Sequence, residues 1–197
     1  MQVNNTSIEQ IKGIVPPMVT PFTASGDVDP EAISQEVAYL VKEARVHGLA
    51  VCGSTGEGHT LTTEDTRLIT ETTVTAVGGR VPVITGIITD STQGSVERGQ
   101  AVADLGVAAL QVTPVHYLFR PTDDAMVTHF RTLCDETGLP VMIYNVVPWT
   151  YLSPQLLDRI LTEVDGVIGV KQSAGDVKLL ADLLVSSSEK GRIMTAV

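Results

Sequence analysis

Short apolar runs alternate with amphipathic stretches along this chain of 197 residues. Within the runs nearly every position is hydrophobic, a pattern typical of strands that are covered on both faces. Each run therefore predicts one strand, with the chain ending inside the last of them. The first predicted strand lies with its proline-rich exit at residues 13–22, and the other six lie at 47–53, 81–87, 108–114, 139–145, 166–171 and 192–197.

The amphipathic stretches between the runs predict six helices. The first begins at Asp29-Pro30-Glu31, which supplies a capping carboxylate, a proline in the first turn and an acidic side chain near the positive end of the helix dipole. Apolar residues then recur at helical spacing on one face. The helices are expected at about 29–44, 62–77, 90–105, 122–137, 153–164 and 176–186.

Strict alternation of strands and helices predicts an α/β fold with a parallel sheet, either doubly wound or closed into a barrel. Neither GxGxxG after the first strand nor GxxxxGK[ST] is present, which disfavours nucleotide-binding versions. The repeat of roughly 25–32 residues matches (β/α)8 construction, which typically needs about 250 residues. We therefore expect a single TIM-barrel domain over residues 1–197 that is incomplete at the C-terminus, lacking strand 8 and the C-terminal helices.

The net charge of -10 argues against non-specific binding to nucleic acid or to an anionic membrane surface. Two cysteines, Cys52 and Cys134, give no disulfide framework and indicate a reduced compartment. No apolar run approaches the roughly 20 residues of a membrane helix, and the N-terminus is too polar for a signal peptide. We expect a cytoplasmic protein without nucleic-acid or membrane partners.

Lys171 is the strongest candidate for chemistry. Of the five lysines in the sequence, it alone closes an apolar strand, GVIGV. A lysine at the carboxyl end of a barrel strand is partly removed from water, which lowers its pKa and frees the amine as a nucleophile. The alternative is a lysine that simply extends from the strand end into water.

Two further groups are expected near Lys171. Tyr144 closes the preceding strand, so its phenol is placed to carry protons, although a tyrosine packed for stability gives the same pattern. Gly53, Ser54 and Thr55 form a glycine-flanked turn after the second strand. Its backbone N–H groups and hydroxyls can hold a carboxylate without a cation, although an ordinary βα turn looks alike.

The loops after the fourth and fifth strands carry aromatic side chains. Trp149 follows Pro148 in the loop after Tyr144, where it can wall a substrate pocket or merely cover apolar surface. Tyr117 lies with His116 in the loop after the fourth strand. The four histidines show no metal-ligand spacing with one another or with Cys52, so no metal is expected.

Together these residues resemble the dihydrodipicolinate synthase / N-acetylneuraminate lyase family of class I aldolases. The matching pieces follow the family's order and spacing, each at a predicted strand end, and span essentially the whole chain. They are Pro21-Phe22, GSTGE (53–57), VTP (112–114), YN (144–145) and GVKQSAGD (169–176).

The resemblance implies a TIM barrel of eight βα units with extra C-terminal helices, usually assembled as a tetramer built from two dimers. It implies that Lys171 forms a Schiff base with pyruvate or a pyruvate-derived 2-oxo acid, so that no cofactor is needed to make or break the adjacent C–C bond with an aldehyde partner. It also implies that Tyr144 shuttles protons, and that Ser54 and Thr55 bind the carboxylate, Thr55 within a proton relay.

Two departures bear on the substrate. After VTP, where the synthase branch carries a pair of tyrosines, this chain has Val115-His116-Tyr117 and a longer loop. Trp149 stands roughly where that branch carries an arginine for a substrate carboxylate. We therefore expect an aldolase or lyase acting on a different aldehyde. The alternatives are dihydrodipicolinate synthase itself, condensing pyruvate with aspartate semialdehyde, a non-catalytic 2-oxo acid-binding or regulatory protein, and an inert fragment.

Overall fold

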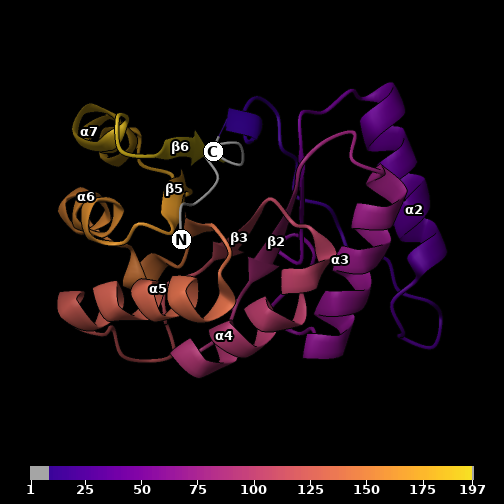
Figure 1. The fold of residues 1–197 in the computed structure, drawn as a ribbon, viewed down its shortest axis with the longest axis horizontal. Helices are drawn as coiled ribbons and strands as arrows, with labels where there is room; N and C mark the ends of the chain where they lie inside the picture. The colour runs from indigo at the N-terminus through magenta and orange to yellow at the C-terminus, as the bar shows by residue number, and fades with distance from the viewer. Residues whose placement is uncertain (1–8, 197) are drawn as a thin grey trace.

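A computed structural model describes residues 9–196. Six strands form one parallel sheet in which each strand is hydrogen-bonded to the next along the chain (Figure 1). The predicted alternation of strands and helices is thereby confirmed, as a parallel half-barrel. The strands are β1 (Leu49–Val51), β2 (Val83–Ile87), β3 (Ala109–Val112), β4 (Val141–Asn145), β5 (Val167–Gln172) and β6 (Arg192–Thr195).

The helices lie in an arc outside the sheet, from α2 and α3 at one end to α6 and α7 at the other (Figure 1). Each begins after an Asp, Ser or Thr whose side chain accepts hydrogen bonds from first-turn N–H groups, which explains why they start where the sequence predicts. They are α2 (Pro30–Ala38), α3 (Thr63–Val77), α4 (Thr92–Ala101), α5 (Asp123–Thr137), α6 (Pro154–Glu163) and α7 (Val177–Ser187).

The strand predicted at 13–22 is wrong. This segment forms only isolated bridges, a parallel one between Pro17 and Ala50 and an antiparallel one between Phe22 and Val28. Ala50 N donates to the Pro16 carbonyl and Met18 N donates to the Ala50 carbonyl. Prolines 16 and 17 have no N–H to extend the ladder, so the segment lies beside β1 without becoming a strand.

Two predicted helices are also less regular than expected. The first continues past α2 as a π-helical turn at Tyr39–Glu43, and the helix expected at 90–105 ends at Ala101 and is followed by a 3-10 turn at Ala103–Leu105. Gly94 and Gly99 lie inside α4, and glycine weakens a helix interior. Within residues 9–196, no helix is long and apolar enough to cross a bilayer.

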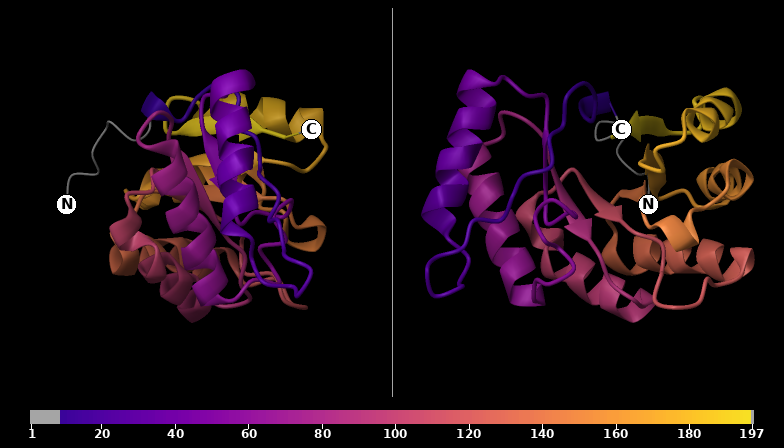
Figure 2. Two further views of the ribbon diagram at one scale, coloured as in Figure 1. Left: turned by 90° about the vertical axis from the view of Figure 1, so that its right-hand side faces the viewer. Right: turned by 180° about the vertical axis from the view of Figure 1, so that it is seen from behind.

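Buried side chains pack on both faces of the sheet. Most lie between the sheet and the surrounding helices, whose arc is seen from behind in Figure 2. A smaller cluster fills the inner face, as expected for the first layer inside a barrel. That cluster consists of Ile11, Ala50, Ile84, Ala109, Met142 and Ile168.

Strand β5 contains an irregularity that matters for the site. Val141 pairs with Val167, but the next residue of β4, Met142, pairs with Gly169, so β5 holds one extra residue. Ile168 joins the inner cluster, whereas Val167 and Val170 pack outward against the helices. The bulge thus changes which residues of β5 face inward after Ile168.

Candidate active site

Lys171 lies in β5 between the two neighbouring strands, paired with Tyr144 of β4 and Met194 of β6. Its residue is only 9% exposed, and it forms no ion pair with the part of the chain that the structure describes. Burial therefore lowers the pKa of the Lys171 amine below its ordinary value. An amine so placed reaches its neutral, nucleophilic form more readily than a lysine in water.

Tyr144 is buried and lies directly against this amine. Lys171 Nζ lies over the face of the Tyr144 ring, 4.4 Å from its centroid. The ring face favours the charged ammonium, whereas burial favours the neutral amine and lowers its pKa. The structure thus brings together the two residues proposed for chemistry, with the amine against the ring and not against the hydroxyl.

A small cavity lies on the inner face of the sheet beside Lys171. Its volume is about 50 Å³, which exceeds the roughly 10–15 Å³ that one water molecule requires. Lys171 is the one charged residue among the described residues that line it. The others are Val15, Pro17, Ile84, Gln111, Met194, Thr195 and Ala196.

The predicted carboxylate-binding turn follows β1. Gly56 N and Gly58 N both donate to the Gly53 carbonyl, and Thr20 Oγ1 donates to the Gly56 carbonyl. Ser54 and Thr55 are exposed. Their hydroxyls are therefore open to a ligand at the carboxyl end of the sheet.

Gly53 connects this turn to the inner cavity. A Cβ at Gly53 would lie 3.7 Å from Gln111 Nε2. The Gln111 side chain thus lies beside the turn and also lines the cavity that contains Lys171.

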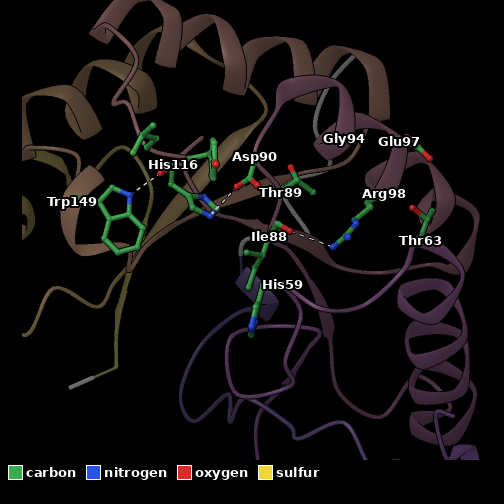
Figure 3. A pocket seen from close by; sticks show the side chains of 12 residues that line it. His59, Thr63, Ile88, Thr89, Asp90, Gly94, Glu97, Arg98, His116 and Trp149 are labelled. Atoms are coloured by element: carbon green, nitrogen blue, oxygen red, sulfur yellow. Dashed lines mark hydrogen bonds and ion pairs between the residues drawn. The ribbon is translucent and has the colours of Figure 1, made fainter. Parts of the chain in front are cut away.

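Tyr117 and Trp149 lie in a different place. Both line a larger cavity of about 830 Å³ that Lys171 does not line (Figure 3). Tyr117 is 71% exposed and Trp149 is 64% exposed. The predicted site residues therefore form two groups, one around the buried amine and one around this outer cavity.

The outer cavity is built from the segments that follow β1, β2, β3 and β4 and from helix α4. Trp149 Nε1 donates to the His116 carbonyl (2.7 Å), and His116 Nε2 lies 3.2 Å from Asp90 Oδ1 (Figure 3). Arg98 donates to the backbone carbonyls of Gly58, Ile88 and Leu61. These contacts hold the loops together at the carboxyl end of the sheet.

Asn145 is a structural residue of the site to which the sequence assigned no role. Its Nδ2 donates to Gln172 Oε1 (2.7 Å) and to the Leu152 carbonyl (3.1 Å), and its Oδ1 accepts from Leu152 N (2.9 Å). All three residues are buried. Asn145 thus ties the loop that carries Trp149 to the residue after Lys171.

Gln111 is a second residue of the site to which the sequence assigned no role. The signal was present, because it is the one polar residue inside the apolar run AALQV. The side chain at position 111 could face either the outer helices or the inner side of the sheet, and the sequence does not distinguish these two faces. No group of three or more His, Cys, Asp or Glu side chains suited to a metal occurs within residues 9–196.

Fold and site together define a parallel half-barrel of alternating strands and helices, with a buried lysine at the carboxyl end of a strand. The chain belongs to the Dihydrodipicolinate synthetase family, whose sequence profile matches residues 10–194. The family expected from the sequence motifs is thereby confirmed.

Several related proteins can be aligned with most of this chain. The 4-hydroxy-tetrahydrodipicolinate synthase of Bacillus subtilis (strain 168) is 36% identical over 175 residues, which are 87% of this chain and 59% of that protein. A chloride-inhibited dihydrodipicolinate synthase from Acinetobacter baumannii, solved with pyruvate, has a TM-score of 0.88 at 26% identity, over 94% of this chain and 63% of that one.

A second enzyme type is equally similar in fold. The N-acetylneuraminate lyase of Mycoplasma synoviae has a TM-score of 0.84 at 26% identity, covering 95% of this chain and 63% of its own. The present chain thus spans about three fifths of the length of these relatives.

Proposed function

We propose that this protein is a lyase that forms a Schiff base between Lys171 and pyruvate or a pyruvate-derived 2-oxo acid. The observation that carries the proposal is the buried Lys171 amine, which has a lowered pKa and faces an inner cavity at the carboxyl end of a parallel sheet. Active groups of barrel enzymes lie at this end of the strands.

The proposed chemistry needs only the amine and a proton carrier. The neutral Lys171 nitrogen attacks the ketone carbon, and the carbinolamine loses water to give a protonated imine. In cleavage, the electron pair of the adjacent C–C bond moves into the imine, giving an enamine and an aldehyde. In condensation, the enamine carbon attacks the aldehyde, and water then releases the product from Lys171. No cofactor is proposed.

The neighbouring residues take the remaining roles. Tyr144, which touches the amine, carries protons to and from the carbinolamine and the substrate oxygen. The turn at Gly53, Ser54 and Thr55 holds the carboxylate, with Thr55 in the proton relay. We assign Tyr117 and Trp149 to the wall that receives the aldehyde partner.

Pyruvate is the first ligand to test, since the related Acinetobacter baumannii enzyme was solved in complex with it. The protein is incubated with pyruvate, reduced with borohydride and mapped by peptide mass spectrometry. We expect one stable adduct, on Lys171, and none when Lys171→Met is treated in the same way. A folded wild-type sample without an adduct would favour a non-catalytic 2-oxo acid-binding or regulatory protein.

Dihydrodipicolinate synthesis is the second candidate, favoured by the name and 36% identity of the Bacillus subtilis relative. Trp149, in place of the expected arginine, disfavours it because an indole cannot pair with a second substrate carboxylate. A coupled assay with pyruvate and aspartate semialdehyde separates the two. Turnover comparable to that of the relative would establish the synthase activity and contradict the expectation that the aldehyde partner is not aspartate semialdehyde.

Three broader expectations extend this proposal. We propose a closed eight-stranded barrel, assembly as a homodimer or homotetramer, and a cytoplasmic location. Sedimentation velocity of the purified protein measures the assembly directly, and a monomer at micromolar concentration would contradict it.

A further inference from the structure

The Gln111 side chain points into the inner face of the sheet. In β3, Leu110 and Val112 pack outward against the helices, whereas Ala109 belongs to the inner cluster. Successive side chains of a strand alternate between faces, so Gln111 shares the inward face with Ala109. It is 3% exposed and is the polar residue of an otherwise apolar strand.

The Gln111 amide has hydrogen-bonding capacity that the chain does not use. A primary amide offers two N–H donors and one carbonyl acceptor. Within residues 9–196, the Gln111 side chain forms no hydrogen bond. Its amide borders the cavity and is not among the fully enclosed polar groups that lack a partner, so a molecule in the cavity can reach it.

The position of this amide relative to the other site residues identifies the partner. Gln111 lines the same cavity as Lys171. Its Nε2 lies beside Gly53, the first residue of the turn assigned to the carboxylate. Gln111 therefore lies between the nucleophile and the turn, as a group contacting a short 2-oxo acid must.

We propose that Gln111 donates a hydrogen bond to the carboxylate of the 2-oxo acid that condenses with Lys171. This inference rests on the proposed function and adds a binding residue to it. A neutral amide suits the position for an electrostatic reason. A carboxylate side chain there would raise the pKa of the Lys171 amine and repel the substrate, whereas an amide binds the anion and leaves the amine neutral.

The test measures how much pyruvate is needed to trap the protein. Borohydride trapping is followed by intact-mass analysis across a pyruvate series, giving a half-saturating concentration for each variant. Gln111→Leu should raise this concentration roughly ten- to hundredfold, the range for loss of a hydrogen bond to a charged group. Gln111→Glu, which keeps the shape and adds a negative charge, should raise it further. Gln93→Leu, an exposed glutamine of α4, serves as the matched control and should leave it unchanged.

Methyl pyruvate separates a carboxylate contact from a general packing effect. Its ester is uncharged, so Gln111→Leu should change its half-saturating concentration much less than that of pyruvate. Thermal unfolding should show no loss of stability in Gln111→Leu, since the variant removes an unpaired buried amide. A structural role for Gln111 predicts the reverse, with lower stability and unchanged trapping.

The outcomes distinguish a binding role of Gln111 from a structural one. An unchanged half-saturating concentration in both folded Gln111 variants, or equal losses with pyruvate and methyl pyruvate, overturns it. If Gln111→Leu fails to fold, Gln111→Glu carries the comparison alone. Failure of the wild-type protein to form an adduct on Lys171 overturns the proposed function itself, whereas a wild-type adduct with unaltered Gln111 variants overturns only the role of Gln111.

Discussion

Replacing Asn145 by leucine should unfold the protein more easily and loosen one loop of the site in particular. The substitution leaves three buried groups without their partner, the Leu152 N–H, the Leu152 carbonyl and Gln172 Oε1. At about 1–3 kcal/mol for each unsatisfied group, the free energy of unfolding should fall by at least about 3 kcal/mol. That is a large part of the roughly 5–15 kcal/mol by which native domains are stable.

Urea unfolding followed by circular dichroism measures this loss. Trp149 is the one tryptophan in the sequence, so its fluorescence reports on the loop that Asn145 holds. In Asn145→Leu we expect the fluorescence anisotropy of Trp149 to fall before the global transition, because the loop becomes mobile first. Gln155→Leu, an exposed glutamine at the start of α6, is the control and should change neither signal.

Asn145→Asp sharpens the test. Its carboxylate still accepts from Leu152 N, and Gln172 can turn its Nε2, which has no partner among the described residues, towards the second oxygen. Because the new carboxyl is fully buried and faces the Leu152 carbonyl, we expect a smaller loss than in Asn145→Leu at acidic pH, where the protonated carboxyl can donate to that carbonyl. A loss below about 1 kcal/mol in Asn145→Leu, or no difference between the variants, would refute the assignment of these hydrogen bonds as the support of the loop.

Three other variants test the chemistry. Lys171→Met should melt at a higher temperature than wild type at pH 7, as measured by differential scanning calorimetry. Burial lowers the pKa of the amine in the folded state, so the wild-type protein loses stability as the pH falls from the ordinary pKa of 10.5 towards the folded-state pKa. The difference in melting temperature should therefore shrink above pH 10.5. Tyr144→Phe should slow turnover by roughly 100–10,000-fold while borohydride trapping persists at long incubation, and a wild-type rate would remove the phenol from the mechanism. Trp149→Arg should raise kcat/KM for an aldehyde bearing a carboxylate by roughly tenfold or more, and equal effects on a neutral aldehyde would show that the gain is not electrostatic.

The alternation of elements was predictable because it depends on local signals. The helix expected at 122–137 is found at Asp123–Thr137, between a threonine cap and the left-handed Gly138, and both ends are encoded within a few residues. The strand at 13–22 failed because hydrophobicity outweighed the two prolines in that prediction, although the missing N–H groups decide the outcome.

The arrangement of the site was less predictable, since it depends on contacts between strands. Chain order correctly indicated that Tyr144 and Lys171 are neighbours in adjacent strands. It could not indicate that Tyr117 and Trp149 line a separate cavity, or that Gln111 turns inward, because loop paths and strand register follow from packing across the whole sheet.

The bulge in β5 determines which face of the sheet carries the Lys171 amine. Lys171 lies four residues beyond Val167, so regular alternation would place both side chains on the helix-covered face, and the extra residue is what turns the amine inward. Gly169 supplies the spare residue where even a methyl group would collide with the Arg192 carbonyl. Straightening β5 without removing a residue would therefore turn the amine towards the helices, although every side chain named in the proposed mechanism would still be present.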